Sequence, residues 1–118
     1  MSQELSVTIK ATFAKSGVTE KIAPGAVAID VAGSRMIHNV QAVGTNAELL
    51  LLGDVAPGWI VGVNRDSSNY VDFSPDGTNF LIRAKAGETF AFRSVSTTTI
   101  YAKANTGSCN VEFWAIDA

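Results

Sequence analysis

The chain of 118 residues is poor in the residues that most often carry chemistry, with one cysteine, Cys109, and one histidine, His38. One cysteine cannot form a disulfide within the chain, whereas small extracellular domains usually contain several. A zinc site needs more thiol and imidazole ligands than these two residues supply. No Gly-x-Ser-x-Gly motif and no second histidine are present to activate a serine. We therefore expect no disulfide, no metal, no cofactor and no triad hydrolase.

Two kinds of chemistry stay open on the sequence alone. A pair of carboxylates, as in glycosidases, cannot be recognised from spacing, although most of the 11 acidic residues lie beside turns. His38 lies in a β-rich segment, where a lone imidazole is usually an ordinary hydrogen-bonding group, and a pH-sensing role is the alternative. Neither observation indicates a reaction. We predict that the protein is not an enzyme.

The chain also lacks clustered positive charge and long hydrophobic runs. Its nine lysines and arginines are scattered and the formal net charge is −2, so we expect no direct contact with nucleic acid. The longest apolar run, residues 49–52, is far too short to span a bilayer. Residues 1–6 show no basic start followed by an apolar block, as a secretory signal would. We expect a soluble protein that is made in a cytoplasm.

What the chain does contain is β-strand patterning. Residues 5–13 alternate strictly between apolar and polar side chains, which is typical of a strand with one dry and one wet face. Similar short segments follow, separated by Gly, Pro, Asn and Asp. We expect strands over residues 5–13, 18–22, 26–31, 36–43, 48–52, 59–63, 70–73, 80–83, 89–95, 97–103 and 109–116.

This pattern predicts an all-β fold, an antiparallel β-sandwich or barrel of roughly eight to ten short strands. A chain of this length forms one domain with one core, so residues 1–118 are expected to be a single domain. Residues 64–69 are polar throughout and predict an exposed loop at the tip of the sandwich.

One segment has the spacing of a metal site. Asp72, Ser74, Asp76 and Gly77 match the opening of a calcium-binding loop. Such a loop needs a glutamate at its twelfth position, where this chain has Arg83, and it needs flanking helices rather than strands. An Asp-Gly turn that closes a β-hairpin explains the same residues without a metal. We prefer the hairpin.

The last predicted strand carries apolar groups on both faces. Trp114 and Ile116 share one face with Glu112. A monomer would leave one apolar face in water, at a cost of about 25 cal/mol per Å². This favours burial against a partner chain. The residues of the opposite face are Val111, Phe113 and Ala115.

The two tryptophans, Trp59 and Trp114, have a second interpretation. Exposed indole rings on a sandwich stack well on sugar rings, which is typical of carbohydrate-binding modules. The alternative is that both rings lie in the core or in a contact between subunits, which we prefer.

The C-terminal two thirds of the chain resemble a known family. Residues 36–117 are similar to the small jelly-roll capsid decoration (cement) proteins of tailed bacteriophages, and the first 35 residues match only in strand style. The similar segments are Asn69-Tyr70-Val71, Ala86-Gly87-Glu88, Tyr101-Ala102-Lys103-Ala104 and Val111-Glu112-Phe113-Trp114.

The resemblance implies a jelly-roll fold, no active site and assembly in the host cytoplasm. It also implies a homotrimer that binds the major capsid protein at the virion surface and stabilises the head shell. Another phage structural role, in the tail, baseplate or head fibre, is the closest alternative, followed by a carbohydrate-binding module.

The first strand has two possible roles in such an assembly. It either completes its own sandwich, which is the commoner arrangement, or acts as an N-terminal arm or exchanged strand, over residues 1–13, that adds to a neighbour. We expect the interface with other copies or with the capsid to involve Leu5, Val7, Ile9, Trp59, Trp114 and Ile116.

Overall fold

The computed structural model describes residues 3–118, which contain ten strands in three antiparallel sheets and no helix. This confirms the predicted all-β fold. The chain divides into two compact units, one that extends to Ala32 and one that spans Gly33–Ala118, whereas the sequence predicts a single domain. No helix of the described residues is long and apolar enough to cross a membrane.

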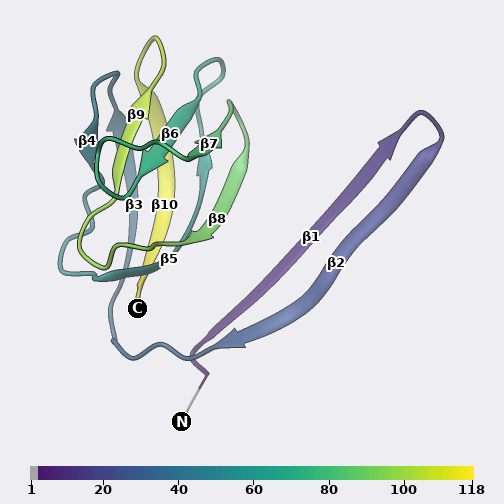
Figure 1. Cartoon of the computed structure of the whole chain (residues 1–118), viewed down its shortest axis with the longest axis horizontal. Coiled ribbons are helices and arrows are strands. Elements are labelled where there is room, and N and C mark those ends of the chain that lie inside the picture. Colours follow the sequence, from purple (N-terminus) through teal and green to yellow (C-terminus); the bar gives the residue numbers. More distant parts are fainter. Residues whose placement is uncertain (1–2) are drawn as a thin grey trace. The chain divides into compact units, whose positions relative to one another are not determined.

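The first unit is a long β-hairpin formed by β1 (Leu5–Lys15) and β2 (Val18–Ile29) (Figure 1). Ser16 and Gly17 connect the strands with φ angles of 53° and 81°. Positive φ at both central residues is typical of the two-residue turn whose twist matches that of paired strands. In the described chain β1 pairs with β2 alone, so it does not complete a sheet of the sandwich, as the commoner arrangement would require.

The prediction of two separate strands at 18–22 and 26–31 is wrong, because β2 continues through Pro24 and Gly25. The pairing shifts register there: Ile9 lies opposite Gly25, whereas Ala11 lies opposite Ile22. A bulge absorbs the one extra residue of β2 and tolerates a proline, which has no N–H to donate. The Pro-Gly pair therefore bends the strand without ending it.

The second unit is a β-sandwich of two four-stranded sheets, with strand orders β3-β10-β5-β8 and β4-β9-β6-β7 (Figure 1). The strands pair as β3 with β10, β4 with β9, β5 with β8 and β6 with β7. These nested pairs are the topology of an eight-stranded jelly roll. The bounds are β3 (Met36–Val43), β4 (Glu48–Leu49), β5 (Pro57–Asn64), β6 (Val71–Ser74), β7 (Ile82–Ala84), β8 (Thr89–Arg93), β9 (Tyr101–Ala104) and β10 (Cys109–Asp117).

Two predicted strands are much shorter in the structure. The strand expected over 48–52 ends at Leu49, and the strand expected over 97–103 begins only at Tyr101. At the second site the Ser96 hydroxyl accepts hydrogen bonds from the N–H groups of Thr98 and Thr99, at 3.3 and 3.1 Å. A serine that binds nearby backbone groups in this way forms a turn in place of a strand ladder.

The core lies between the two sheets and depends on one glycine for its packing. Phe113 of β10 and Phe90 of β8 flank Gly62 of β5 in a single row of the sheet. A Cβ atom on Gly62 would lie 2.5 Å from the Phe90 ring and 2.3 Å from the Glu112 carbonyl oxygen. Because Gly62 has no side chain, the phenylalanine rings on either side of it both have room to pack into the core.

A buried carboxylate ties the starts of β3 and β5 to the end of β10. Asp117 accepts backbone hydrogen bonds from Ser34, Arg35 and Ala56, at 3.1, 2.9 and 2.9 Å. Burial opposes ionisation, but these N–H groups, that of Ala56 foremost, hold the pKa of Asp117 below its usual range. The same carboxylate packs so closely against Gly33 that a Cβ there would lie 2.3 Å from one of its oxygens.

Candidate assembly surfaces

The hairpin presents one apolar face. Residues that lie directly opposite in the register share a face, so Leu5 with Ile29 and Val7 with Val27 form successive apolar rows. Ile9 and Phe13 continue this face toward the turn. Five of its large side chains are 47–56% exposed, namely Ile9, Phe13, Val18, Ile22 and Val27.

Nothing in the described part of the hairpin unit covers this face. Predicted interface residues Leu5 and Val7 are half-buried by their cross-strand neighbours, and Ile9 is exposed. A two-stranded hairpin is at best marginally stable in water. A hairpin that exposes a continuous apolar strip therefore has the character of an assembly element.

The outer face of the sheet β3-β10-β5-β8 gathers the other predicted interface residues. Trp114 lies beside His38 and Val61 in one row, and Ile116 lies beside Trp59 in the next. All five residues point away from the core side of the sheet, because they alternate with buried neighbours. Two further apolar residues of this face, Met36 and Val40, are exposed and were not among the predicted interface residues.

Trp114 is the centre of a small network on this face. The His38 ring stacks on the Trp114 ring with a centroid distance of 4.2 Å and an interplanar angle of 3°. His38 Nε2 lies 2.7 Å from a carboxylate oxygen of Glu112, and Arg65 donates to the other oxygen at 2.7 and 3.0 Å. The Arg65 hydrogen bond and then that of His38 lower the pKa of Glu112.

Trp59 is held in a different way. The Arg93 guanidinium carbon lies 5.7 Å from the centroid of the Trp59 ring. The indole Nε1 of Trp59 is buried and has no hydrogen-bond partner among the described residues. One face of the Trp114 ring is thus covered by an imidazole, and the only polar atom of the Trp59 ring is inaccessible.

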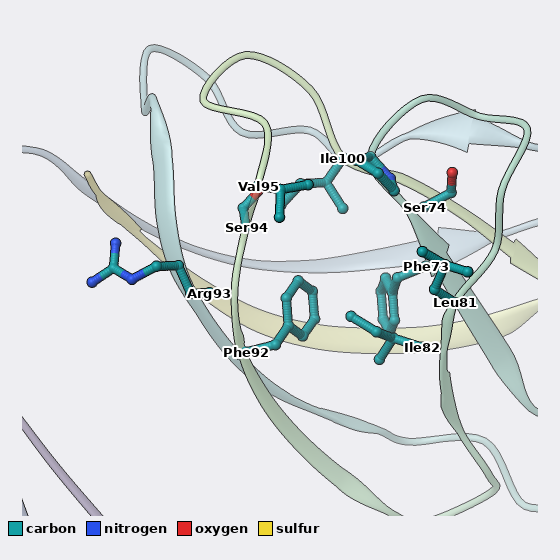
Figure 2. Close-up of a pocket in the computed structure, with 10 residues that line it drawn as sticks. Phe73, Ser74, Leu81, Ile82, Phe92, Arg93, Ser94, Val95 and Ile100 are labelled. Carbon is teal, nitrogen blue, oxygen red and sulfur yellow. The ribbon is translucent and has the colours of Figure 1, made fainter.

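An apolar pocket opens between the β7 and β8 edges of the two sheets, with a volume of about 110 Å³. Figure 2 shows Phe73, Phe92 and Ile82 side by side in its floor. Leu81 and Val95 stand at its margins and are 77% and 86% exposed. No pattern in the chain predicted this pocket, because its lining residues come from four separate segments.

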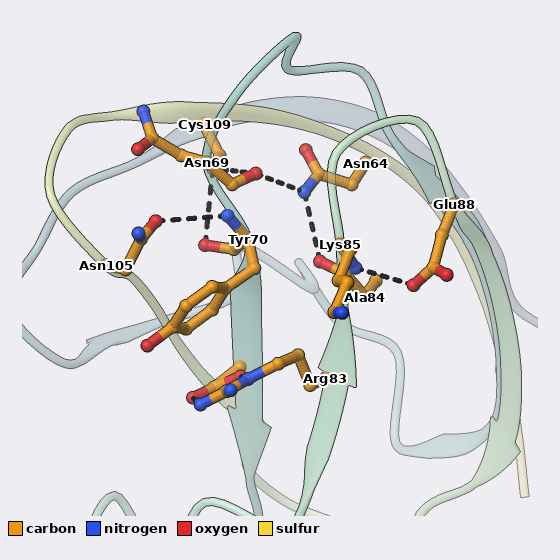
Figure 3. Close-up of polar contacts among 10 residues, drawn as sticks. Asn64, Asn69, Tyr70, Arg83, Ala84, Lys85, Glu88, Asn105 and Cys109 are labelled. Atoms are coloured by element: carbon orange, nitrogen blue, oxygen red, sulfur yellow. Dashed lines mark hydrogen bonds and ion pairs between the residues drawn. The ribbon is translucent and has the colours of Figure 1, made fainter.

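A polar cluster closes the opposite part of the sandwich (Figure 3). Asn64 is fully buried, and its amide donates to the carbonyls of Asn69 and Ala84 at 2.8 and 3.1 Å. The prediction that residues 64–69 form an exposed tip is therefore wrong at its first residue. Cys109 lies beside this cluster, and burial raises the pKa of its thiol.

The residues with calcium-loop spacing are engaged by the protein. Asp76 accepts hydrogen bonds from the backbone N–H groups of Asn79 and Thr78, which hold its pKa well below the usual range. Asp72 binds the Arg83 guanidinium through both oxygens, at 2.7 and 3.0 Å. Gly77 has a φ of 81°, as expected for the predicted hairpin turn.

Comparisons of the chain with protein-family models, with curated proteins and with solved structures found no match.

Proposed function

We propose that the protein is a virion structural component that decorates and stabilises the head shell of a tailed phage. Its partners are the major capsid protein and further copies of itself, in a homotrimer assembled in the host cytoplasm and carried on the capsid surface. One observation carries most weight: a filled jelly roll bears a separate hairpin whose apolar face is uncovered.

Two further features support this proposal. The resemblance to cement proteins covers residues 36–117, which coincides with the jelly-roll unit. Jelly rolls recur in viral capsid domains. The resemblance implies in addition a sheet-rich body combined with a strand or terminal arm that contacts the shell. The hairpin has the features of such a segment, because its strands alternate apolar and polar side chains and most of its residues are exposed.

Burial of the hairpin face would supply a useful part of the binding free energy. Full burial of a large apolar side chain contributes about 1.5–3 kcal/mol, so each half-exposed group of the hairpin adds roughly 1 kcal/mol. Because a protein that binds only the intact shell shifts the equilibrium toward that shell, even modest contacts protect it. Several equivalent contacts in one oligomer add avidity.

A lectin-like role is the second function that jelly rolls commonly serve. Its sequence support was the pair Trp59 and Trp114. Sugar binding needs an accessible ring face and nearby polar groups, whereas His38 stacks on Trp114 and the Trp59 N–H is buried. These contacts favour the structural role.

The direct test incubates the purified protein with undecorated, expanded phage heads. We expect the protein to co-sediment with the heads and to raise their resistance to heat. A protein that stays in the supernatant, or heads that remain as heat-sensitive as before, would contradict the proposal. Binding to tails or baseplates in place of heads would contradict the head role and support the alternative, a structural role in the tail or baseplate.

A pair of hairpin variants shows whether the apolar face takes part. Val7→Asp places a charge on this face, whereas Thr8→Asp places the same charge on the opposite face of the same strand. We expect Val7→Asp to weaken head binding by about tenfold or more, as loss of a buried apolar group would, and Thr8→Asp to bind like the unmodified protein.

A further inference from the structure

The pocket between the β7 and β8 edges has the size and lining of a receptor for one side chain. A cavity of about 150 Å³ holds a benzene molecule, so 110 Å³ admits one aliphatic or aromatic group. Phe73 and Phe92 form part of its lining, and aromatic rings pack well against other rings in offset or tilted arrangements. Both strands that border the pocket are edge strands with one unpaired side.

The hairpin carries a side chain that fits this pocket. Phe13 lies on the apolar face, near the turn that joins β1 to β2, and is 51% exposed. It is the only aromatic residue of the described hairpin. A side chain at this position can reach another molecule without a change in the hairpin itself.

Charges at the two sites are complementary. Glu20 lies directly opposite Phe13 in the hairpin register, so the two side chains point the same way from neighbouring strands. Arg93 borders the pocket and turns outward from it, as Figure 2 shows. Neither Glu20 nor Arg93 forms an ion pair with any residue in the range 3–118.

We propose that this pocket receives Phe13 from the hairpin of a second copy of the chain, with Glu20 of that hairpin paired to Arg93 at the margin. The exposed side chains of Leu81 and Val95 then close over the inserted ring. The inference rests on the proposed structural role and names the contact through which copies assemble. It covers both the apolar pocket and the hairpin end with one interaction.

The first test measures self-association of the purified full chain by sedimentation velocity, with no capsid present. We expect the unmodified protein to associate, and Phe13→Ala to weaken association by about tenfold or more. Thr12→Ala is the matched control, since Thr12 is the chain neighbour on the opposite face and should associate normally. Equal behaviour of the two variants would overturn the proposal.

The second test exchanges the charges. Glu20→Arg and Arg93→Glu should each weaken association, because each brings like charges together. We expect the double variant to regain association, since the opposite charges are restored. A mixture of the two single variants should associate more strongly than either variant alone, because the hairpin of each variant is complementary in charge to the pocket of the other. Circular dichroism confirms that these exposed substitutions leave the fold intact.

Three results would overturn the inference: a monomeric unmodified protein, a double variant that fails to recover, or recovery without any increase in size, which would indicate a contact within one chain. These outcomes are distinct from failure of the capsid role. If the protein self-associates through Phe13 but does not bind phage heads, the proposed contact between copies is supported and the decoration role is contradicted. If the protein binds heads as a monomer, the decoration role is supported and the proposed contact is contradicted.

Discussion

The hairpin and the jelly roll both contain strands with apolar side chains on one face, but they differ in whether a second sheet buries that face. In the jelly roll, Phe113 is fully buried between two sheets that cover each other. In the hairpin, Phe13 belongs to an equally regular strand and remains 51% exposed, because no second layer of its own unit faces it. Alternation along a strand therefore defines a dry face but does not supply the surface that covers it.

The difference also appears in the polar contacts. Asn64, Asp76 and Asp117 each satisfy several backbone groups of the jelly roll and thereby lock loops to strands. Among residues 3–32, the Val31 N–H donates to a carboxylate oxygen of Glu4 at 3.0 Å and links the two ends of the hairpin. Polar side chains thus tie the loops of the jelly roll to its strands, whereas the hairpin is held mainly by the pairing of its own two strands.

The strongest way to test this comparison is to remove one phenylalanine from each region. Phe113→Ala should lower the free energy of unfolding by about 3–5 kcal/mol, since it opens a cavity in the core. Phe13→Ala should change it by no more than about 0.5 kcal/mol in dilute protein, where copies are not associated. Urea denaturation followed by fluorescence measures both. Similar losses for the two variants would show that the hairpin face is covered within one chain.

A smaller effect is expected at the buried amide of the polar cluster. Asn64→Ala leaves the Asn69 and Ala84 carbonyls without their donor, at a cost of about 1–3 kcal/mol. Asn110 is the matched control, because it lies exposed on β10, and its replacement by alanine should cost no more than about 0.5 kcal/mol. A result in which both variants unfold at the same urea concentration would contradict the role given to Asn64.

The smallest effect between pH 7 and pH 4 concerns the carboxylates of the jelly roll. The fold lowers the pKa of Asp66, Asp76, Glu112 and Asp117 from ordinary values of 3.8 or 4.5. The unfolded chain therefore binds more protons as the pH falls, so their stabilising contribution is complete above about pH 5 and is lost below about pH 4.

Thermal unfolding measured against pH tests this expectation. The melting temperature should be nearly constant from pH 7 to pH 5 and should fall below pH 4. Asp76→Asn should make the decline shallower, because the amide does not titrate. A melting temperature that rises on acidification would have the wrong sign and would exclude these carboxylates as the cause.

Several elements were predictable from local pattern alone. The strict alternation of residues 5–13 and the apolar, β-rich composition of 109–116 predicted strands that the structure confirms with bounds Leu5–Lys15 and Cys109–Asp117. The positive φ of Gly77 followed from the residue chemistry of the predicted Asp-Gly turn. In each case the determining interactions lie within a few residues of one another.

Other elements were not predictable because distant contacts decided them. Pro24-Gly25 predicts the end of a strand, but pairing with β1 lets β2 continue past these residues, with a bulge at that point. Asn64 reads as a loop residue, and only the approach of Ala84 and Asn69 makes it a buried donor. The pocket beside Phe73 exists because four segments converge, which no spacing in the chain reveals.

The amino-acid order by itself determined that this protein is made of strands, which side chains of each strand face inward, and where most turns fall, because these depend on neighbours one to four residues away. Only the tertiary structure decided that the strands separate into a closed jelly roll and an uncovered hairpin. The reason is physical: pairing partners lie up to some 80 residues apart, as for β3 and β10, and their choice depends on how the whole set of faces can be buried at once.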